Sequence, residues 1–166
     1  ESDARVAADA FGEGQDEEAL TYDLIQKTAT SWSLTAAQLS GTNTSGVTAN
    51  IYAWLDLNRN GVFESSEIKS TTFASGASTA ASGLTWTLPS LTGVLEFAFR
   101  IRITTTALTD DSGTAAVDER SLGLATDGEV EDHIIPVAGL VGCSASTSSA
   151  FVVFGSLSDL YKVDLV

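Results

Sequence analysis

The sequence predicts an all-β protein, and more specifically an antiparallel β-sandwich of the jelly-roll or immunoglobulin-like kind. Two observations support this class. Short runs in which apolar and polar residues alternate recur at intervals of about ten residues, with turn-forming residues between them. Apart from a single turn expected at residues 34–39, no segment keeps the period of an amphipathic helix. Together these patterns are typical of two packed antiparallel sheets.

The strand expected at residues 94–104 shows the clearest alternation. Large apolar residues occupy every odd position from Leu95 to Ile103, and charged or small residues stand between them. The run at 47–57 alternates in the same way, with Ile51 on one face and Trp54 on the other. The complete set of expected strands is 19–25, 31–35, 47–57, 68–74, 84–88, 94–104, 128–137, 150–155 and 160–166.

The chain is expected to divide into four segments. Residues 1–19 are acidic and glycine-spaced, which indicates an N-terminal arm, and residues 20–137 hold the sandwich. Residues 138–149 are small and polar, as in a linker. Residues 150–166 form a C-terminal strand extension. The sequence leaves open whether this extension folds back, exchanges between chains or begins another domain.

The charge balance excludes some partners. Acidic residues outnumber basic ones by 22 to 8, and the net charge is −14. Nucleic acids and anionic membranes repel such a polyanion, whereas divalent cations suit it. The single cysteine, Cys143, excludes an internal disulfide, and no apolar run is long enough to span a membrane. Because methionine is absent, even at position 1, we expect a processed piece of a secreted protein.

A metal-binding pattern follows the strand at 47–57. The run DLNRNGVFESSE, residues 56–67, places carboxylate and amide oxygens at alternate positions, and Gly61 permits the sharp turn between them. Calcium prefers such oxygen ligands. The expected ligands are Asp56, Asn58, Asn60, Val62 (through its carbonyl), Glu64 and Glu67.

The residues before this loop alternate as in a strand, so an EF-hand switch between two helices is not expected. The ion would instead lock the loop in place. The simpler alternative is an Asn-Gly hairpin turn without a metal. That turn alone would not require Asp56, Asn58 and Glu67 at these spacings.

A second acidic segment, residues 109–137, admits two interpretations. Its acidic side chains could form a second cation site. Alternatively, Glu129 and Glu131 could pair across strands with Arg100 and Arg102, which have the same spacing of two, and we favour this pairing. The residues of the candidate second site are Asp110, Asp111, Asp118, Asp127, Glu129 and Glu131.

Three segments, AWLDLNRNGVFESSE, EFAFRIRIT and DGEVEDHIIPV, occur in an order that resembles the GEVED domain of bacterial secreted and surface proteins. The resemblance covers roughly residues 16–137. It implies an extracellular β-sandwich within a large, often adhesin-like protein, without known catalytic activity. Two features depart from the family: His133 stands where tyrosine is more usual, and residues 151–166 lie outside the module.

No catalytic motif occurs in the chain. There is no G-x-S-x-G, HExxH or P-loop sequence and no recognisable Cys/His pair, so we do not expect an enzyme. We expect His133 to be structural. Trp32, Trp54 and Trp86 could stack on a sugar, but their strand positions favour core packing for at least two of them.

These observations predict a non-catalytic, calcium-stabilised structural or adhesive module on the bacterial cell surface. One alternative is a subunit of an extracellular filament assembled by donor-strand exchange through residues 150–166. A carbohydrate-binding module is a further alternative. The expected partners are other copies or neighbouring modules, joined through edge strands, and a host protein or glycan. Nucleic-acid binding and membrane insertion are not expected.

Overall fold

The computed structural model describes residues 20–111, 116–123, 125–138, 150–153 and 160–163, the last two ranges by their backbone. The described residues contain strands and one 3-10 helix of three residues, η1 (Glu119–Ser121), so the all-β class is confirmed. The strands are β1 (Ile25–Gln26), β2 (Ser31–Leu34), β3 (Ala49–Leu55), β4 (Ile68–Phe73), β5 (Leu84–Thr87), β6 (Glu96–Thr104), β7 (Glu129–Ala138), β8 (Ala150–Val153) and β9 (Leu160–Val163).

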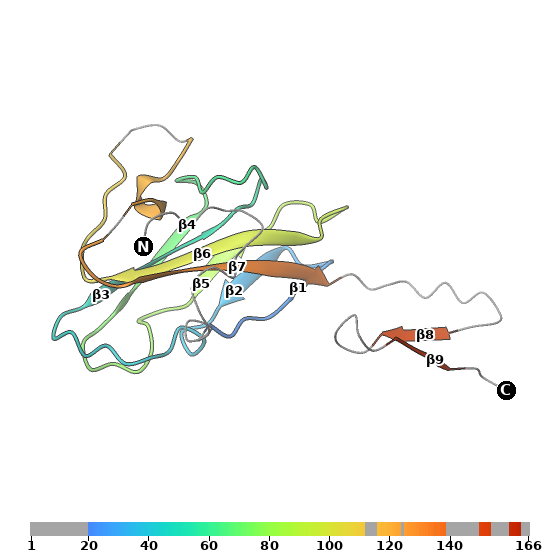
Figure 1. Ribbon diagram of the computed structural model, residues 1–166, viewed down its shortest axis with the longest axis horizontal. Helices are drawn as coiled ribbons and strands as arrows, with labels where there is room; N and C mark the ends of the chain where they lie inside the picture. The colour runs from blue at the N-terminus through green and yellow to red at the C-terminus, as the bar shows by residue number, and fades with distance from the viewer. Residues whose placement is uncertain (1–19, 112–115, 124, 139–149, 154–159, 164–166) are drawn as a thin grey trace.

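The largest sheet has five strands in the order β1-β7-β6-β3-β4 (Figure 1). Its pairs are antiparallel except for β1 and β7, which run parallel, so the sheet is mixed and not wholly antiparallel as predicted. Of the strand expected at 19–25, only Ile25 joins the ladder; it pairs with Val137, and the next residue, Gln26, pairs with Ala138. β2 and β5 form a second sheet, and β8 and β9 pair with each other in a third.

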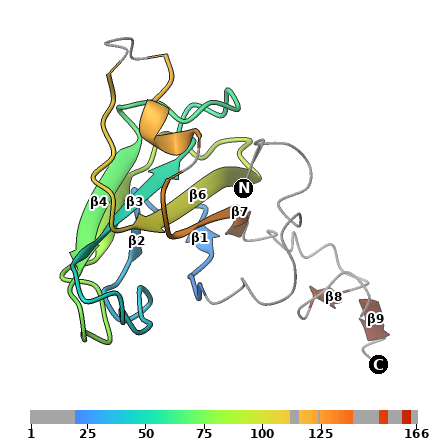
Figure 2. The same ribbon diagram turned by 60° about the vertical axis from the view of Figure 1, so that its left-hand side comes forward.

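The main core lies between the five-stranded sheet and the β2–β5 sheet (Figure 2). Apolar residues of β3 and β6, among them Ala53, Phe97 and Phe99, pack against Trp32 and Trp86 of the smaller sheet. Fully burying each of these large side chains contributes about 1.5–3 kcal/mol. The alternation of apolar residues along β3 and β6 therefore specifies which face of the large sheet is covered.

The opposite face of the large sheet is covered too. Tyr52 and Trp54 of β3 point away from the main core and pack with Phe63 in a second apolar cluster. Phe63 belongs to the loop between β3 and β4, so that loop folds back over the strand that precedes it. β3 is consequently buried on both faces at its C-terminal end, where the predicted metal loop begins.

Three details refine the predicted elements. The strand expected at 94–104 begins at Glu96, and Leu95 is 76% exposed instead of sharing the apolar face. The single turn expected at 34–39 is present, because the Thr35 carbonyl accepts the N–H groups of Gln38 and Leu39. Among the described residues, no helix has the length and apolar character required to cross a membrane.

Candidate metal centre

The predicted metal loop joins β3 to β4 and is anchored on both sides. Phe63 packs into the second apolar cluster, and its carbonyl accepts the N–H of Asp118 at 2.8 Å. On the other side, the Trp86 indole N–H donates to the Glu67 carbonyl at 2.6 Å. Gly61 has φ of 78°, a left-handed conformation that favours glycine. The loop is therefore held between the two apolar clusters.

Two carboxylates of the loop are buried. Asp56 is 3% exposed and Glu67 is 2% exposed. The Asp56 carboxylate accepts the N–H groups of Asn60 at 3.2 Å and Gly61 at 2.9 Å, so it shapes the turn directly. In the described part of the chain, neither carboxylate forms an ion pair with a basic side chain. Buried negative charges without a cationic partner cost free energy.

Glu67 closes the loop from its C-terminal end. Its Oε1 accepts the N–H groups of Leu57 at 2.7 Å and Asn58 at 3.3 Å, and its Oε2 accepts that of Glu64 at 3.1 Å. Burial raises the pKa of Glu67 above 4.5, and the nearby Asp56 charge raises it further, although the backbone hydrogen bonds oppose both effects. The Asp56 charge therefore adds to the cost of keeping the buried Glu67 carboxylate ionised.

The exposed side of the loop holds the remaining polar side chains. The amide groups of Asn58 and Asn60 donate to the two oxygens of Glu64 at 3.0 and 2.9 Å. The side-chain oxygens of Asn58 and Asn60 accept the N–H groups of Asn60 and Val62. The turn therefore already brings together four of the predicted ligands, Asp56, Asn58, Asn60 and Glu64.

The oxygen atoms of the loop suit a hard cation such as calcium. Oxygens of Asp56, Asn58, Asn60 and Glu64 each accept one hydrogen bond, as does Oε2 of Glu67, and each keeps a lone pair for a second interaction. Calcium takes six to eight such oxygens. No group of three Asp, Glu, His or Cys side chains forms a metal-ready cluster in the described residues. A site here therefore depends on the two asparagines as well as the carboxylates.

The second acidic segment is arranged differently. Asp110 accepts a hydrogen bond from the Ser65 hydroxyl at 2.5 Å, beside the metal loop. Asp118 is fully buried, accepts the Trp54 indole N–H at 3.0 Å and is paired with Arg120. These contacts attach the segment around η1 to the metal loop and to the second apolar cluster.

The predicted pairing of Glu129 and Glu131 with Arg100 and Arg102 is wrong. The register places the two glutamates opposite Ile103 and Ile101, on the other face of the sheet from the arginines. Arg100 instead forms a bidentate ion pair with Asp132, with both distances 2.6 Å.

Arg102 binds the carbonyl groups of residues 120, 122 and 123. The two arginines therefore hold the η1 segment against the outer face of the sheet.

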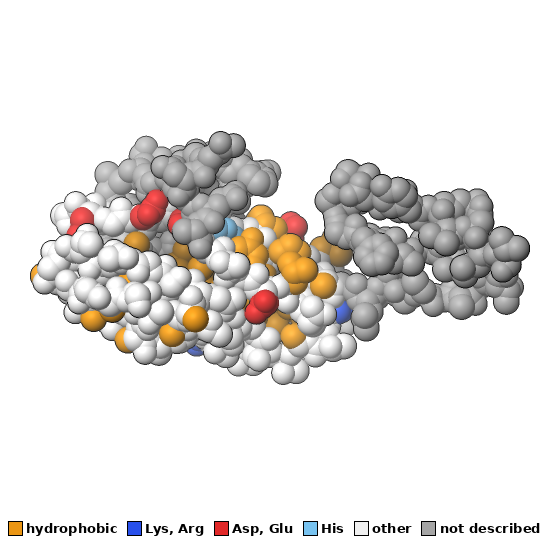
Figure 3. Space-filling model, turned by 90° about the horizontal axis from the view of Figure 1, so that it is seen from below, with side chains coloured by type: hydrophobic (Ala, Val, Ile, Leu, Met, Phe, Trp, Pro, Cys, Tyr) orange, Lys and Arg blue, Asp and Glu red, His pale blue; other side chains and the backbone are white. Residues whose placement is uncertain are grey.

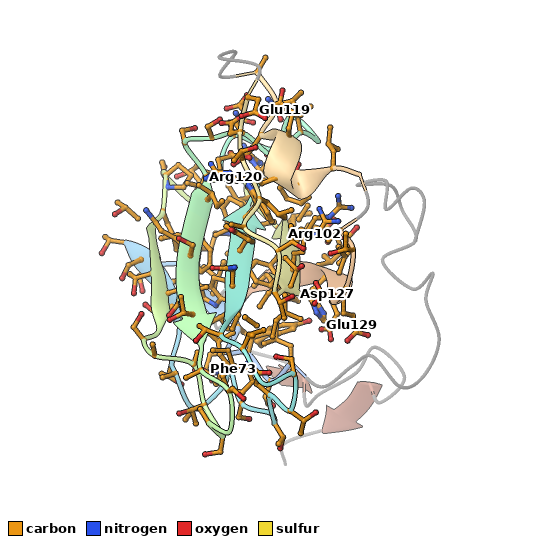
Figure 4. The ribbon with its side chains drawn as sticks, turned by 90° about the vertical axis from the view of Figure 1, so that its left-hand side faces the viewer. Phe73, Arg102, Glu119, Arg120, Asp127 and Glu129 are labelled. Atoms are coloured by element: carbon orange, nitrogen blue, oxygen red, sulfur yellow. The ribbon has the colours of Figure 1, made fainter. Side chains whose placement is uncertain are left out.

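The residues of the candidate second site are also separated. Asp127 accepts hydrogen bonds from Thr104 and Thr105, and these lower its pKa below 3.8. Figure 4 shows Asp127 and Glu129 together beyond Arg102, whereas Glu119 and Arg120 lie at the far end near η1. Asp110 lies near Arg120, Asp111 binds Thr109, and Glu131 contacts His133. The described structure does not bring these carboxylates together as one site.

A protein-family model, the GEVED domain, matches residues 50–136. The chain belongs to the GEVED domain family. The match spans the metal loop, β4 to β6 and most of β7, which are the elements that carry the contacts described above. No curated protein and no solved structure matches the chain.

The GEVED motif itself, residues 128–132, has a structural explanation. Gly128 has φ of 93°, and an added Cβ would lie 1.8 Å from the Ile103 carbonyl oxygen, so only glycine fits. Asp132 neutralises the buried Arg100, and Glu131 accepts a hydrogen bond from His133 at 3.1 Å if that ring nitrogen is protonated. The His133 ring packs against Tyr22 and Phe99, as expected for a structural histidine.

Sequence patterns did not identify several supporting contacts of this GEVED domain. Alternation indicated that Trp86 points inward, but not that its N–H reaches the carbonyl of Glu67 in the loop. No sequence pattern indicated that the Ser65 hydroxyl donates a hydrogen bond to Asp110. Trp32, Trp54 and Trp86 are all buried, so all three rings serve the apolar clusters.

Proposed function

We propose that this GEVED domain is a non-catalytic, calcium-stabilised structural or adhesive module of an extracellular bacterial surface protein. In this proposal the two sheets that enclose the main core act as a β-sandwich, and β8 and β9 form its C-terminal extension. The proposal follows from the metal loop, where buried oxygen donors converge without a basic partner in the described residues. The family membership is consistent with it.

The proposed ligands are Asp56, Asn58, Asn60, Val62, Glu64 and Glu67. A divalent cation among them would offset the repulsion between the buried carboxylates of Asp56 and Glu67. It would also fasten the β3–β4 connection, because Glu67 is joined to Trp86 and Ser65 to Asp110. The cation therefore acts on stability, by linking the loop, the β2–β5 sheet and the η1 segment.

Extracellular calcium is sufficient for such a site. Dissociation constants of about 10⁻⁴–10⁻³ M are typical of extracellular calcium modules. At ten times the dissociation constant, binding adds about 1.4 kcal/mol to the free energy of unfolding. We expect this contribution to protect the module from unfolding and proteolysis outside the cell.

Calorimetric titration with calcium chloride tests the metal site. We expect one calcium ion per chain, and much weaker binding in Glu64→Gln, which removes a charge from a half-buried ligand. Asp111→Asn is the control, because it removes the same charge from a side chain that binds Thr109 and no loop residue in the described structure. Absence of calcium binding by the unaltered chain would refute the proposed site.

The proposed location has its own test. An antibody against the folded domain should stain intact cells of the source bacterium as strongly as permeabilised cells. Brief chelation of calcium should make the domain on intact cells more sensitive to added protease. Staining that requires permeabilisation would contradict an extracellular role.

One observation favours the alternative of a filament subunit. Among the described residues, β8 and β9 pair with each other and not with either sheet of the main core. An isolated two-stranded sheet is marginally stable and gains by joining a larger one. A terminal strand pair of this kind could be donated to a neighbouring subunit.

A further inference from the structure

The outer edge of β7 is open over most of its length in the described structure. β1 pairs with Val137 and Ala138 alone, at the C-terminal end of β7. The Val137 N–H bonds to Leu95 on the β6 side, whereas the Ala138 carbonyl accepts the N–H of Lys27 on the β1 side. Since successive residues of a strand bond to opposite neighbours, the backbone groups of even-numbered residues face outward.

Besides Pro136, which has no N–H group, three residues of β7 share this outward direction with Ala138, namely Val130, Asp132 and Ile134. No described strand pairs with their outward N–H and carbonyl groups. Long unpaired strand edges invite pairing with another chain, and proteins commonly protect them with lysine, proline or a bulge. Within β7, proline occurs only at position 136, beyond this stretch.

The surroundings of the edge define the strand that would fit it. Glu129 and Glu131 lie on the inner face of β7 and line a cavity of about 120 Å³, together with Ile101 and Ile103. Figure 3 shows hydrophobic side chains gathered beside the single histidine (pale blue) and nearby acidic groups. On the outer face, Ile134 is 38% exposed. An uncharged, apolar strand matches this edge, whereas an acidic one is repelled.

The chain contains one segment of this kind that is already a strand. Residues 139–158 carry no charged side chain, and they include β8, Ala150–Val153. β8 pairs only with β9 in the described structure, so this pair retains an unpaired edge of its own. By contrast, residues 1–19 contain seven acidic residues and one arginine, so they are not an uncharged segment of this kind.

β1 makes a second copy the better source of this strand. If β8 formed a hairpin with β7 of its own chain, it would have to pair first with the C-terminal end of β7. There β1 already pairs with Val137 and Ala138. A strand from another molecule can approach the open stretch from the outer face, since Leu20 and Tyr22 lie beside β7 on its inner face. We propose that β8 of a second copy pairs with the outer edge of β7 between Val130 and Ile134.

This inference deepens the proposed function, because it names the edge through which the module joins its neighbours. The contact is heterologous: each copy offers one strand and one edge, so the association continues from copy to copy. It does not involve the metal loop, and it stands or falls separately from calcium binding.

Sedimentation velocity of the full chain in saturating calcium tests the proposal with two variants. Ile134→Pro removes one outward N–H without loss of a bond to β6, and Ile134→Val is its control. Val152→Asp places a charge in the donated strand, and Val152→Thr is its control. We expect concentration-dependent association of the unaltered chain, with each test variant weakening it at least about tenfold.

The two variants should complement each other. Ile134→Pro keeps a functional β8, and Val152→Asp keeps a functional edge, so an equimolar mixture should form heterodimers and nothing larger. A monomeric unaltered chain, or association unaffected by Ile134→Pro, would overturn the proposal.

Amide hydrogen exchange provides a readout on the unaltered chain, in case a variant folds poorly. Exchange at Val130, Asp132 and Ile134 should slow as association increases, and unchanged exchange there would also overturn the proposal. In either case, the calcium titration would still report on the metal site.

Discussion

The metal loop, residues 56–67, and the second acidic segment, residues 109–137, are both rich in carboxylates, but these carboxylates are stabilised in different ways. In the loop, Asp56 and Glu67 are buried among backbone N–H groups, without an ion pair in the described structure. In the second segment, Asp132 is paired with Arg100 and Asp118 with Arg120.

This difference is the reason why we propose an ion from solution for the loop and not for the second acidic segment. Arginine neutralises the carboxylates around η1 and in addition binds the carbonyl groups of the same segment. In the loop, the buried carboxylates of Asp56 and Glu67 accept backbone N–H groups, and Arg59 of the same loop forms no ion pair with them in the described structure. We therefore propose the metal site because these buried carboxylates lack a basic partner there, and not because the sequence is acidic.

The largest effect in this comparison should come from breaking the ion pair between Arg100 and Asp132. Asp132→Ala leaves Arg100, which is 3% exposed, without its carboxylate, and we expect a loss of about 3 kcal/mol in the free energy of unfolding. Urea denaturation measures this loss. The increase in stability on adding calcium should remain, since Asp132 is not a proposed ligand; if it disappeared, calcium binding would depend on the ion pair between Arg100 and Asp132.

A smaller effect is expected for a ligand of the loop that is not fully buried. Glu64→Gln should weaken calcium binding by about tenfold, equivalent to about 1.4 kcal/mol, while calcium-free stability changes less than in Asp132→Ala because Glu64 is only half-buried. Asp111→Asn should leave calcium affinity unchanged. Equal effects of the two variants would show that general charge, and not the loop, governs binding.

The raised pKa of Glu67 predicts an unusual pH dependence. Without calcium, the folded state takes up this proton before the unfolded state as pH falls from neutral towards 4.5, so the Glu67 contribution to stability rises. With calcium, the charged form is favoured, and the stabilisation by calcium should decrease over the same range.

Glu67→Gln serves to isolate this contribution, since it cannot titrate. The urea midpoint of the unaltered chain minus that of Glu67→Gln should increase on acidification without calcium. A difference that is constant with pH would contradict the role assigned to this carboxylate.

The smallest effect is expected at Asp127, which is exposed. Hydrogen bonds from Thr104 and Thr105 lower its pKa, so its contribution is present above pH 3.8 and is lost as pH falls through the lower, folded-state pKa. Asp127→Asn should therefore matter slightly at neutral pH and not at strongly acidic pH. Melting temperatures at both pH values check this, and sensitivity of Asp127→Asn to calcium would contradict its separation from the metal loop.

Local patterns in the sequence predicted the class, most strands and the loop. Alternation identified β3 and β6 because their inner faces are apolar at every second residue. The loop spacing identified Asp56, Asn58, Asn60 and Glu64 because these side chains meet within one turn. Such features depend on residues close together in the chain.

Register between distant strands was not predictable in the same way. Arg100 could face Asp132 or Glu131, and a shift of one residue exchanges the faces of the sheet. The parallel pairing of β1 with β7 likewise joins residues that are far apart in the sequence, such as Ile25 and Val137. Asp110 and Asp127 are separated by the arrangement of these distant strands, and no local sequence motif predicts this separation.

The melting temperature with calcium and with a chelator tests the central claim most directly. The unaltered chain should melt roughly 4–8 °C higher in saturating calcium. Asp56→Ala, which lacks a buried ligand, should melt at the same temperature in both conditions and below the unaltered chain. An unaltered chain whose melting temperature does not respond to calcium would contradict the account.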